Sequence, residues 1–263
     1  FTYYNSSGNI RLVDNLSSLL VLNDKYFNNY ISLTNTVYQK FDIVRCESET
    51  QVLPFMRLWG DAGYDQYGIY DWNGKSISRI SIVATKGTGS RSAEPTLFSN
   101  NSGLIANLTL KNFSIPNGTG NSAGLVYNNG GVISNCTTGP SGETLTVTNT
   151  IGGIVNSNKY GTTQQGMILN CKNYLKLTGK SVGGIVCEMA GGWCIGSINS
   201  GEIVADYTGG VIGGIVGSIS GKVVVLNNTN KASITTKAAH TGGFVGKITS
   251  ADSEGTIIKN NIS

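Results

Sequence analysis

A glycine-aliphatic signature recurs about every 30 residues and limits the fold of this 263-residue chain more than any other feature. The segments read SAGLV, IGGIV, VGGIV, IGGIV and TGGFV, at 122–126, 151–155, 182–186, 212–216 and 241–245. The steps between the last glycines (Gly124, Gly153, Gly184, Gly214 and Gly243) are 29, 31, 30 and 29 residues. This period indicates a solenoid in which each repeat is one structural unit stacked on the last.

Two further landmarks follow the signature in each repeat. One reads GVISNC at 131–136 and GMILNC at 166–171, and the other reads LTVTNT at 145–150 and YLKLTG at 174–179. Their alternation of apolar and polar residues suits half-buried strands. We therefore predict an all-β fold, a parallel β-helix or β-solenoid with three short strands in each coil of about 30 residues. We call the GVISNC and GMILNC segment the second landmark, the signature being the first. Its sixth position is apolar in every repeat but the last: Leu108, Cys136, Cys171, Ile198, Leu226 and Asn260.

The glycine pair itself predicts a tight corner. The first glycine could supply a positive φ, and the second could let the chain pass close to the neighbouring coil. The aliphatic residue or the valine after it should then point inward. The predicted inward row is Leu125, Ile154, Ile185, Ile215 and Phe244, or else the valines that follow them.

These motifs resemble the GLUG repeat, a module of large secreted and surface proteins. The resemblance extends upstream to YDWNGKSISRISI at 70–82 and EPTLFSNNSGLIANLTL at 94–110, and so covers nearly the whole chain. It implies a right-handed parallel β-helix with a non-catalytic extracellular role, and no active site is carried over. The chain departs from the pattern at Ala123, which replaces the first glycine of a pair, and at Pro95 and Thr96.

The resemblance also implies an entry segment in which a short helix precedes the first strand. Asp14 or Asn15 could cap a helix through Leu16 and Leu22, so we expect an N-terminal cap at 1–25. The β-helix, of about seven coils, should occupy 26–263. We expect GTIIKNNIS at 255–263 to end within a coil, so that the chain continues into more repeats or its edge stacks on another copy.

Composition argues against several classes of function. Only 13% of residues are charged, the net charge is +4, and the basic residues form no cluster, so no nucleic-acid partner is expected. No apolar stretch approaches the roughly 20 residues of a membrane span. The carboxylates recur at no common strand position and the cysteine spacings match no zinc pattern. We therefore predict neither an enzyme, nor a cofactor, nor a metal site.

One aromatic and acidic patch is the exception that keeps an alternative open. Its residues are Asp61, Tyr64, Asp65, Tyr67, Asp71 and Trp72. Such a patch could hold a sugar or a calcium ion, although solvated loop carboxylates are the commoner explanation. The alternative function is therefore a carbohydrate-binding or carbohydrate-cleaving β-helix.

The cysteines and some asparagines recur in step with the coils. Cys187 and Cys194 bracket six residues, a spacing that suits a local disulfide closing a hairpin-like excursion. Cys136 and Cys171 share one position in successive coils, where two buried thiols or a disulfide are both possible, and the state of Cys46 is open. The preceding asparagines, Asn107, Asn135 and Asn170, predict an inward ladder hydrogen-bonded from coil to coil.

Nine Asn-x-Ser/Thr sequons favour a secretory route, and five of them fall between residues 100 and 135. The candidate glycosylation sites are Asn112, Asn117, Asn100, Asn5 and Asn227. We predict a secreted or surface-displayed structural glycoprotein, either an adhesin stalk or a subunit of a surface or filamentous assembly. Its expected partners are other copies of itself, surface proteins or glycans.

Overall fold

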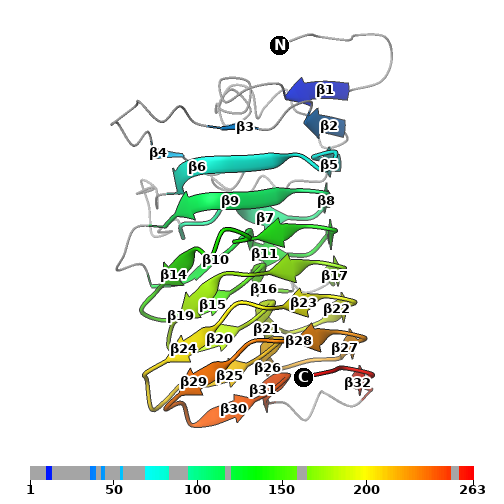
Figure 1. Ribbon diagram of the computed structural model, residues 1–263. Helices are drawn as coiled ribbons and strands as arrows, with labels where there is room; N and C mark the ends of the chain where they lie inside the picture. Colours follow the sequence, from blue (N-terminus) through cyan, green and yellow to red (C-terminus); the bar gives the residue numbers. More distant parts are fainter. Residues whose placement is uncertain are drawn as a thin grey trace, which may run out of the picture.

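The chain folds into a stack of short parallel strands, an all-β parallel β-solenoid (Figure 1). The computed structural model describes residues 10–13, 36–39, 43–44, 54–55, 69–82, 94–115, 120–158, 165–249 and 255–263. No helix occurs among these residues, and the predicted fold class is confirmed. The helix expected at Leu16–Leu22 lies outside the described residues.

Five sheets run along the stack. The nine-stranded sheet contains β1 (Ile10–Val13), β2 (Thr36–Gln39), β5 (Ile69–Asp71), β8 (Leu104–Ala106), β12 (Val132–Ser134), β17 (Met167–Leu169), β22 (Gly192–Ile195), β27 (Val223–Leu226) and β32 (Ile257–Lys259). The eight-stranded sheet contains β3 (Ile43–Val44), β4 (Pro54–Phe55), β6 (Ser76–Ile82), β9 (Thr109–Ser114), β13 (Thr137–Thr138), β18 (Lys172–Asn173), β23 (Ile198–Asn199) and β28 (Thr229–Asn230).

The other three sheets complete the wall. The six-stranded sheet contains β7 (Phe98–Asn101), β11 (Val126–Asn129), β16 (Val155–Ser157), β21 (Val186–Met189), β26 (Val216–Ile219) and β31 (Val245–Ile248). The five-stranded sheet contains β10 (Ser122–Ala123), β15 (Thr150–Gly152), β20 (Ser181–Gly183), β25 (Val211–Gly213) and β30 (His240–Gly242). The four-stranded sheet contains β14 (Thr144–Thr146), β19 (Lys176–Thr178), β24 (Ile203–Ala205) and β29 (Ile234–Thr236).

A complete turn therefore visits five sheets, as in the run from β15 to β19, and not the three strands predicted. The additional strands arise because the signature bends at its second glycine and divides between the five-stranded and six-stranded sheets. Bends at Asn135 and Asn170 likewise divide the second landmark from the short strand that follows it.

The signature marks about five turns, one for each strand of the five-stranded sheet. Its register is as predicted, because the valines that end it pair in sequence from turn to turn: Val126, Val155, Val186, Val216 and Val245. The nine-stranded sheet reaches further toward the N-terminus. Its first strand, β1, lies within the expected cap and pairs with β2. The sheet thus begins before residue 26.

The core contains both of the rows that were predicted as alternatives. Leu125, Ile154, Ile185 and Ile215 are fully buried, and so are the four valines that follow them. In the last turn, Phe244 and Val245 are partly buried and pack against the core. Both rows can point inward because the chain bends between the glycine and the valine.

The second landmark keeps its predicted register only in the earlier coils. The position of Leu108, Cys136 and Cys171 continues at Ser197, Asn228 and Asn261, and not at Ile198, Leu226 and Asn260. The apolar row therefore becomes polar toward the C-terminus. The predicted register was wrong because it places Trp193, the first residue of WCIGSI at 193–198, beside Gly221, the first residue of GKVVVL at 221–226. In the structure Trp193 pairs with Val224.

Candidate functional site

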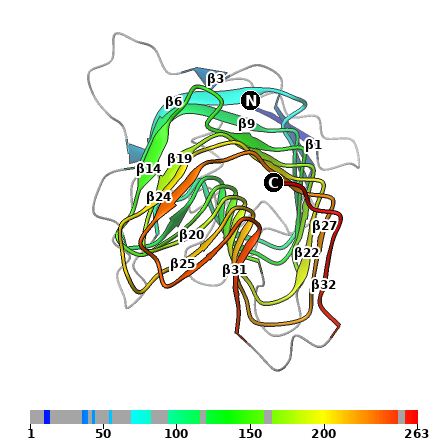
Figure 2. The ribbon, with the colours of Figure 1, turned by 60° about the horizontal axis from the view of Figure 1, so that its bottom comes forward.

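The most specific arrangement of polar groups lies inside the solenoid, where the glycine corner meets the opposite wall. Figure 2 shows that the edge where the sheet of β25 meets the sheet of β31 points into the cross-section. A Cβ atom added to Gly184 would lie 2.0 Å from the Gly214 carbonyl oxygen and 2.3 Å from Asn199 Nδ2. The corner thus touches the next turn and the eight-stranded sheet at once, leaving no room for a side chain.

The two glycines of the pair have different roles, and one prediction about them was wrong. The second glycine permits close approach to the next turn, as expected. The first does not supply a positive φ at Gly152, Gly183 or Gly213. Instead, a Cβ on Gly183 would lie 1.7 Å from the carbonyl oxygen of Val186, so this glycine is required by the sharpness of the bend.

A buried amide ladder receives the corner. Asn173, Asn199 and Asn230 stack at the ends of β18, β23 and β28, and each is almost or fully buried. Asn173 Nδ2 donates to Asn199 Oδ1 at 2.8 Å, and Asn199 Nδ2 donates to Asn230 Oδ1 at 3.1 Å. Thr138 continues the ladder upward, because its hydroxyl lies 3.1 Å from Asn173 Oδ1.

The same ladder binds the corner itself. The single hydroxyl proton of Thr138 is also within reach of the Gly153 carbonyl oxygen, at 2.9 Å, and is donated either there or to Asn173. Asn230 Nδ2 donates to the Gly243 carbonyl oxygen at 3.0 Å. Buried polar groups are costly unless they are hydrogen-bonded. The ladder meets this requirement along the stack while fixing the corner against the wall.

A second buried ladder, at the end of the six-stranded sheet, was also missed. Asn101 Nδ2 donates to Asn129 Oδ1 at 2.8 Å, and Asn129 Nδ2 donates to Asn158 Oδ1 at 2.8 Å. Asn158 Nδ2 then donates to the carbonyl oxygens of Gly166 and Gly191. All three asparagines are fully buried. Their spacing of 28 and 29 residues was a signal in the sequence that could have revealed them.

The inward ladder predicted at Asn107, Asn135 and Asn170 is wrong, because these side chains lie on the outside of the solenoid. These residues have φ values of 59°, 53° and 53°, and the column continues with Asn227 and Asn260. Asn135 and Asn170 are exposed, and Asn107 is partly exposed. Asparagine tolerates the left-handed conformation better than most residues, so the bend explains the repeat. Coil-to-coil bonds exist here, since Asn135 Nδ2 donates to Asn107 Oδ1 at 3.3 Å, but they lie on the outside.

The described part of the expected sugar patch is mainly structural. Trp72 is 1% exposed and packs edge-on against Phe98, with ring centroids 6.3 Å apart, so its ring cannot stack on a ligand at the surface. Asp71 Oδ1 accepts hydrogen bonds from the Asn73 backbone N–H and from Asn107 Nδ2. The other patch residues, Asp61, Tyr64, Asp65 and Tyr67, lie outside the described residues.

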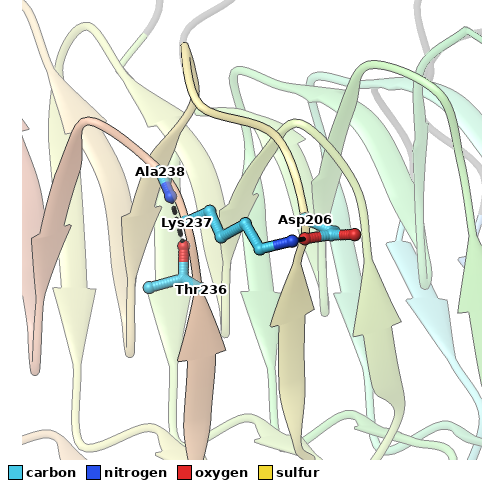
Figure 3. A network of polar contacts seen from close by, with 4 residues as sticks. All are labelled: Asp206, Thr236, Lys237 and Ala238. Atoms are coloured by element: carbon cyan, nitrogen blue, oxygen red, sulfur yellow. Dashed lines mark hydrogen bonds and ion pairs between the residues drawn. The ribbon is translucent and has the colours of Figure 1, made fainter.

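Two carboxylates on the four-stranded side each face a lysine one turn away. Lys176 Nζ lies 2.8 Å from Glu202, and Lys237 Nζ lies 2.5 Å from Asp206 (Figure 3). In the same view the Ala238 N–H donates to Thr236 Oγ1 at 2.8 Å. These ion pairs are exposed and worth little in stability. Among the described residues no group of three His, Cys, Asp or Glu side chains could hold a metal ion.

The local disulfide expected between Cys187 and Cys194 is not formed, since both thiols are free and buried. Cys187 lies in β21 and its Sγ contacts the Ser181 carbonyl oxygen, whereas Cys194 lies in β22 and its Sγ contacts Asn228 Oδ1. The segment between them passes from one sheet to the next. Of these two cysteines, Cys194 packs into the apolar core and Cys187 does not.

Cys136 and Cys171 occupy successive turns of the core as free, fully buried thiols. Burial raises the pKa of Cys136 well above its ordinary value, and the neighbouring Cys171 thiol adds to the effect. Burial likewise raises the pKa of Cys187 and Cys194; the Glu188 carboxylate contributes at Cys187 and the Cys171 thiol at Cys194. Cys136, Cys187 and Cys194 are therefore protonated packing groups and not reactive thiolates.

The candidate glycosylation sites differ in exposure. Asn112 and Asn227 are exposed, and both have a positive φ. Asn100 is partly exposed and its Oδ1 accepts a hydrogen bond from Asn128 Nδ2 at 3.0 Å. Asn5 and Asn117 lie outside the described residues. Within the described part of the chain no helix has the length and apolar character needed to cross a membrane.

Among the comparisons with known proteins, the one with solved structures gives a match, and it concerns the fold alone. No family model and no curated protein matches the chain. A crystal structure described as "a putative immunoglobulin A1 protease from Bacteroides ovatus" matches with a TM-score of 0.65 and 20% identity. The match covers 91% of this chain and 74% of the other. At this identity the likeness establishes a shared β-solenoid architecture.

Proposed function

We propose that this protein is a non-catalytic structural β-solenoid of the extracellular surface, built from GLUG-type repeats and N-glycosylated. The observation that carries this proposal is the row of buried side-chain hydrogen bonds that joins successive turns. From Thr138 to Asn230, buried side chains link each turn to the next, and the glycine corner is held against them. A wall cross-linked in this way resists bending and is suited to a stalk or to a subunit of an assembly.

The outer wall supports the same proposal. The carboxylates of Glu202 and Asp206 are each paired with a lysine on a neighbouring turn. Glycosidases require two carboxyl groups facing one another across a substrate. The protease activity ascribed to the Bacteroides ovatus protein stays with that protein, because 20% identity carries the fold and not the reaction.

A carbohydrate-binding or carbohydrate-cleaving function is the second candidate. It is favoured by the accessible carboxylate of Asp71, which lies at the edge of the predicted patch. Because Trp72 is buried, any sugar stacking there would depend on Tyr64 or Tyr67.

The experiment that separates the two candidates is a glycan-array and polysaccharide-cleavage screen of the 263-residue chain. The structural proposal predicts neither selective binding nor cleavage. Binding abolished by Asp71→Asn together with Tyr64→Ala, but retained in Glu202→Gln, would favour the second candidate.

The extracellular part of the proposal has a test of its own. We expect glycopeptides containing Asn112 or Asn227 in protein from its native source, because both side chains are exposed. Unmodified asparagine at every sequon would remove the support for N-glycosylation. Protein recovered only from the cell interior would overturn the surface location.

A further inference from the structure

The chain contains three asparagines that are followed by glycine: Asn73, Asn117 and Asn129. Such an asparagine can lose its side-chain amide, because the backbone nitrogen of the next residue can attack the side-chain carbonyl carbon and glycine has no side chain to obstruct the approach. The rate depends on exposure and on the hydrogen bonds that hold the two reacting groups. Asn117 lies outside the described residues, and the other two asparagines have opposite environments.

Asn73 lies in a turn that is longer than its counterpart in the next coil. Asp71 and Ser76 are separated by the four residues 72–75. Their pairing partners, Ala106 and Thr109, are separated by only the two residues 107 and 108. The two additional residues are accommodated on the outside of the solenoid, between β5 and β6.

The centre of this turn is formed by Asn73 and Gly74, which have φ values of 51° and 70°. The Lys75 N–H closes the turn by donating to the Trp72 carbonyl oxygen at 2.8 Å. Asn73 and Gly74 are both exposed, and a Cβ atom added to Gly74 would meet no atom within 4 Å. Water therefore reaches both residues of the pair.

Neither reacting group of this turn is held in place. Among the described residues, the side-chain amide of Asn73 has no hydrogen-bond partner, although its backbone N–H donates to Asp71 Oδ1 at 2.8 Å. The Gly74 N–H likewise donates to no group in the described part of the chain. The attacking nitrogen and the carbonyl that it would attack are thus both free to move.

The pair at Asn129 is enclosed. Asn129 is fully buried in the second amide ladder, where its Oδ1 accepts from Asn101 and its Nδ2 donates to Asn158, each at 2.8 Å. The Gly130 N–H donates to the Asn101 carbonyl oxygen at 2.7 Å. Both reacting groups are therefore hydrogen-bonded, and they are released only when the ladder opens.

We propose that Asn73 is a site of spontaneous deamidation in the folded protein and that Asn129 is protected. The Gly74 nitrogen forms a bond to the side-chain carbonyl carbon of Asn73, the bond from that carbon to Nδ2 breaks, and Nδ2 leaves as ammonia with the Gly74 amide proton. Water then opens the cyclic imide at either of its carbonyl groups, giving aspartate or isoaspartate. The reaction consumes water and releases ammonia, with no oxidation or reduction.

The products change the bend at which they form. Both add a carboxylate beside Asp71, whose Oδ1 accepts from the Asn73 N–H and from Asn107 Nδ2 in the next turn. Isoaspartate also adds a methylene group to the backbone of the turn that Lys75 closes. The modification is local, and it is independent of whether the protein is a stalk or binds sugars.

Peptide mass spectrometry of the folded 263-residue chain, incubated at mildly alkaline pH, tests the proposal. Trypsin releases Asn73 in a peptide of residues 58–75 that contains no other asparagine, and fragment spectra separate Asn129 from Asn117. We expect Asn73 to convert at least about tenfold faster than Asn129, because Asn129 reacts only through opening of the ladder. In urea the two rates should become similar. Equal rates in the folded protein, or no conversion of Asn73 before unfolding, would overturn the proposal.

Gly74→Ala tests the route of the reaction. Alanine is strained at a φ of 70°, but its methyl group meets no neighbour and obstructs only the attacking nitrogen. We expect the rate at Asn73 to fall severalfold, both in the folded protein and in urea, while the rate at Asn129 stays unchanged. The wild type should yield isoaspartate as well as aspartate. An unchanged rate at Asn73, or aspartate alone, would indicate direct hydrolysis and contradict the cyclisation.

Discussion

Two columns of asparagines run along this solenoid with the same period and opposite roles. Asn173, Asn199 and Asn230 point inward and form a buried hydrogen-bonded ladder. Asn170 and Asn227 lie three residues before two of them, on the outside, in a left-handed conformation. At the inner positions asparagine is needed for the hydrogen bonds of its side-chain amide, whereas at the outer positions it is needed because its backbone tolerates a positive φ. A repeated residue type therefore has no single structural meaning.

The largest expected effect concerns the glycine corner that rests on the inner column. Gly184→Ala places a methyl group against the Gly214 carbonyl oxygen and Asn199. Since one obstacle is backbone, we expect a loss of more than about 3 kcal/mol in the free energy of unfolding, measured in urea. Gly120→Ala is the control, because nothing lies within 4 Å of its added Cβ. Equal midpoints for the two variants would show that the corner is not closely packed.

The aliphatic residue after the corner should rank next. Ile185→Ala leaves a cavity in the core and should cost about 2–4 kcal/mol. Phe244→Ala, at the equivalent position of the last turn, should cost less than is usual for phenylalanine, because Phe244 is only partly buried. Thermal unfolding of both variants checks the order. A larger loss of stability from Phe244→Ala would contradict the lower burial of the last turn.

The inner and outer asparagines can be compared directly. Asn199→Ala leaves the donor of Asn173 and the acceptor of Asn230 without their partner, so we expect a loss of about 2–3 kcal/mol. Asn227→Ala should cost about 1 kcal/mol, for the left-handed backbone alone. Urea denaturation measures both losses. A larger loss in the free energy of unfolding for Asn227→Ala than for Asn199→Ala would contradict the comparison.

The sequence predicted the fold class because glycine corners and alternating strands repeat in step. It did not separate the two asparagine columns, since both recur once per coil and only the bend between them decides which points inward. A usable signal was nevertheless present. Cys171 was expected to be inward, and Asn173 lies two residues later on the same face of the chain.

The aromatic and acidic patch could not be judged from composition. Trp72 and Asp71 are neighbours, yet one is in the core and the other at the surface, as alternation in a strand requires. The spacing of Cys187 and Cys194 was equally ambiguous. It suits a disulfide only if the intervening segment folds back on itself, and here it crosses between sheets.

The buried thiols give a smaller effect that depends on pH. Burial raises the pKa values of Cys187 and Cys194 above the ordinary 9.0, so the folded state favours the protonated form of these two thiols. Below pH 9 these thiols are protonated in both the folded and the unfolded state, so they leave the free energy of unfolding unchanged. Above pH 9 the unfolded state loses the proton first, and the free energy of unfolding falls by up to about 1.4 kcal/mol per thiol for each pH unit. Urea midpoints at pH 8 and pH 10 check this, with Cys194→Ala expected to be less pH-dependent. An identical pH dependence for that variant would contradict it.

The smallest effect belongs to the outer column. Gly196 occupies this position in one turn with a φ of 66°. Asn170→Gly should therefore change the free energy of unfolding by no more than about 0.5 kcal/mol, whereas Asn170→Val should cost about 1–2 kcal/mol. Similar losses for both variants would show that the asparagine side chain, and not the backbone, is what the position requires.

Hydrogen exchange of the side-chain amides tests most directly whether the two columns differ as described. In a spectrum of the folded protein labelled at asparagine, the NH₂ groups of Asn173 and Asn199 should exchange with D₂O only through opening of the solenoid. Those of Asn135 and Asn227 should exchange within the dead time, because their side chains are exposed. Protection of the inner pair by several orders of magnitude is the predicted result. Equal exchange rates for the inner and outer pairs would contradict the account.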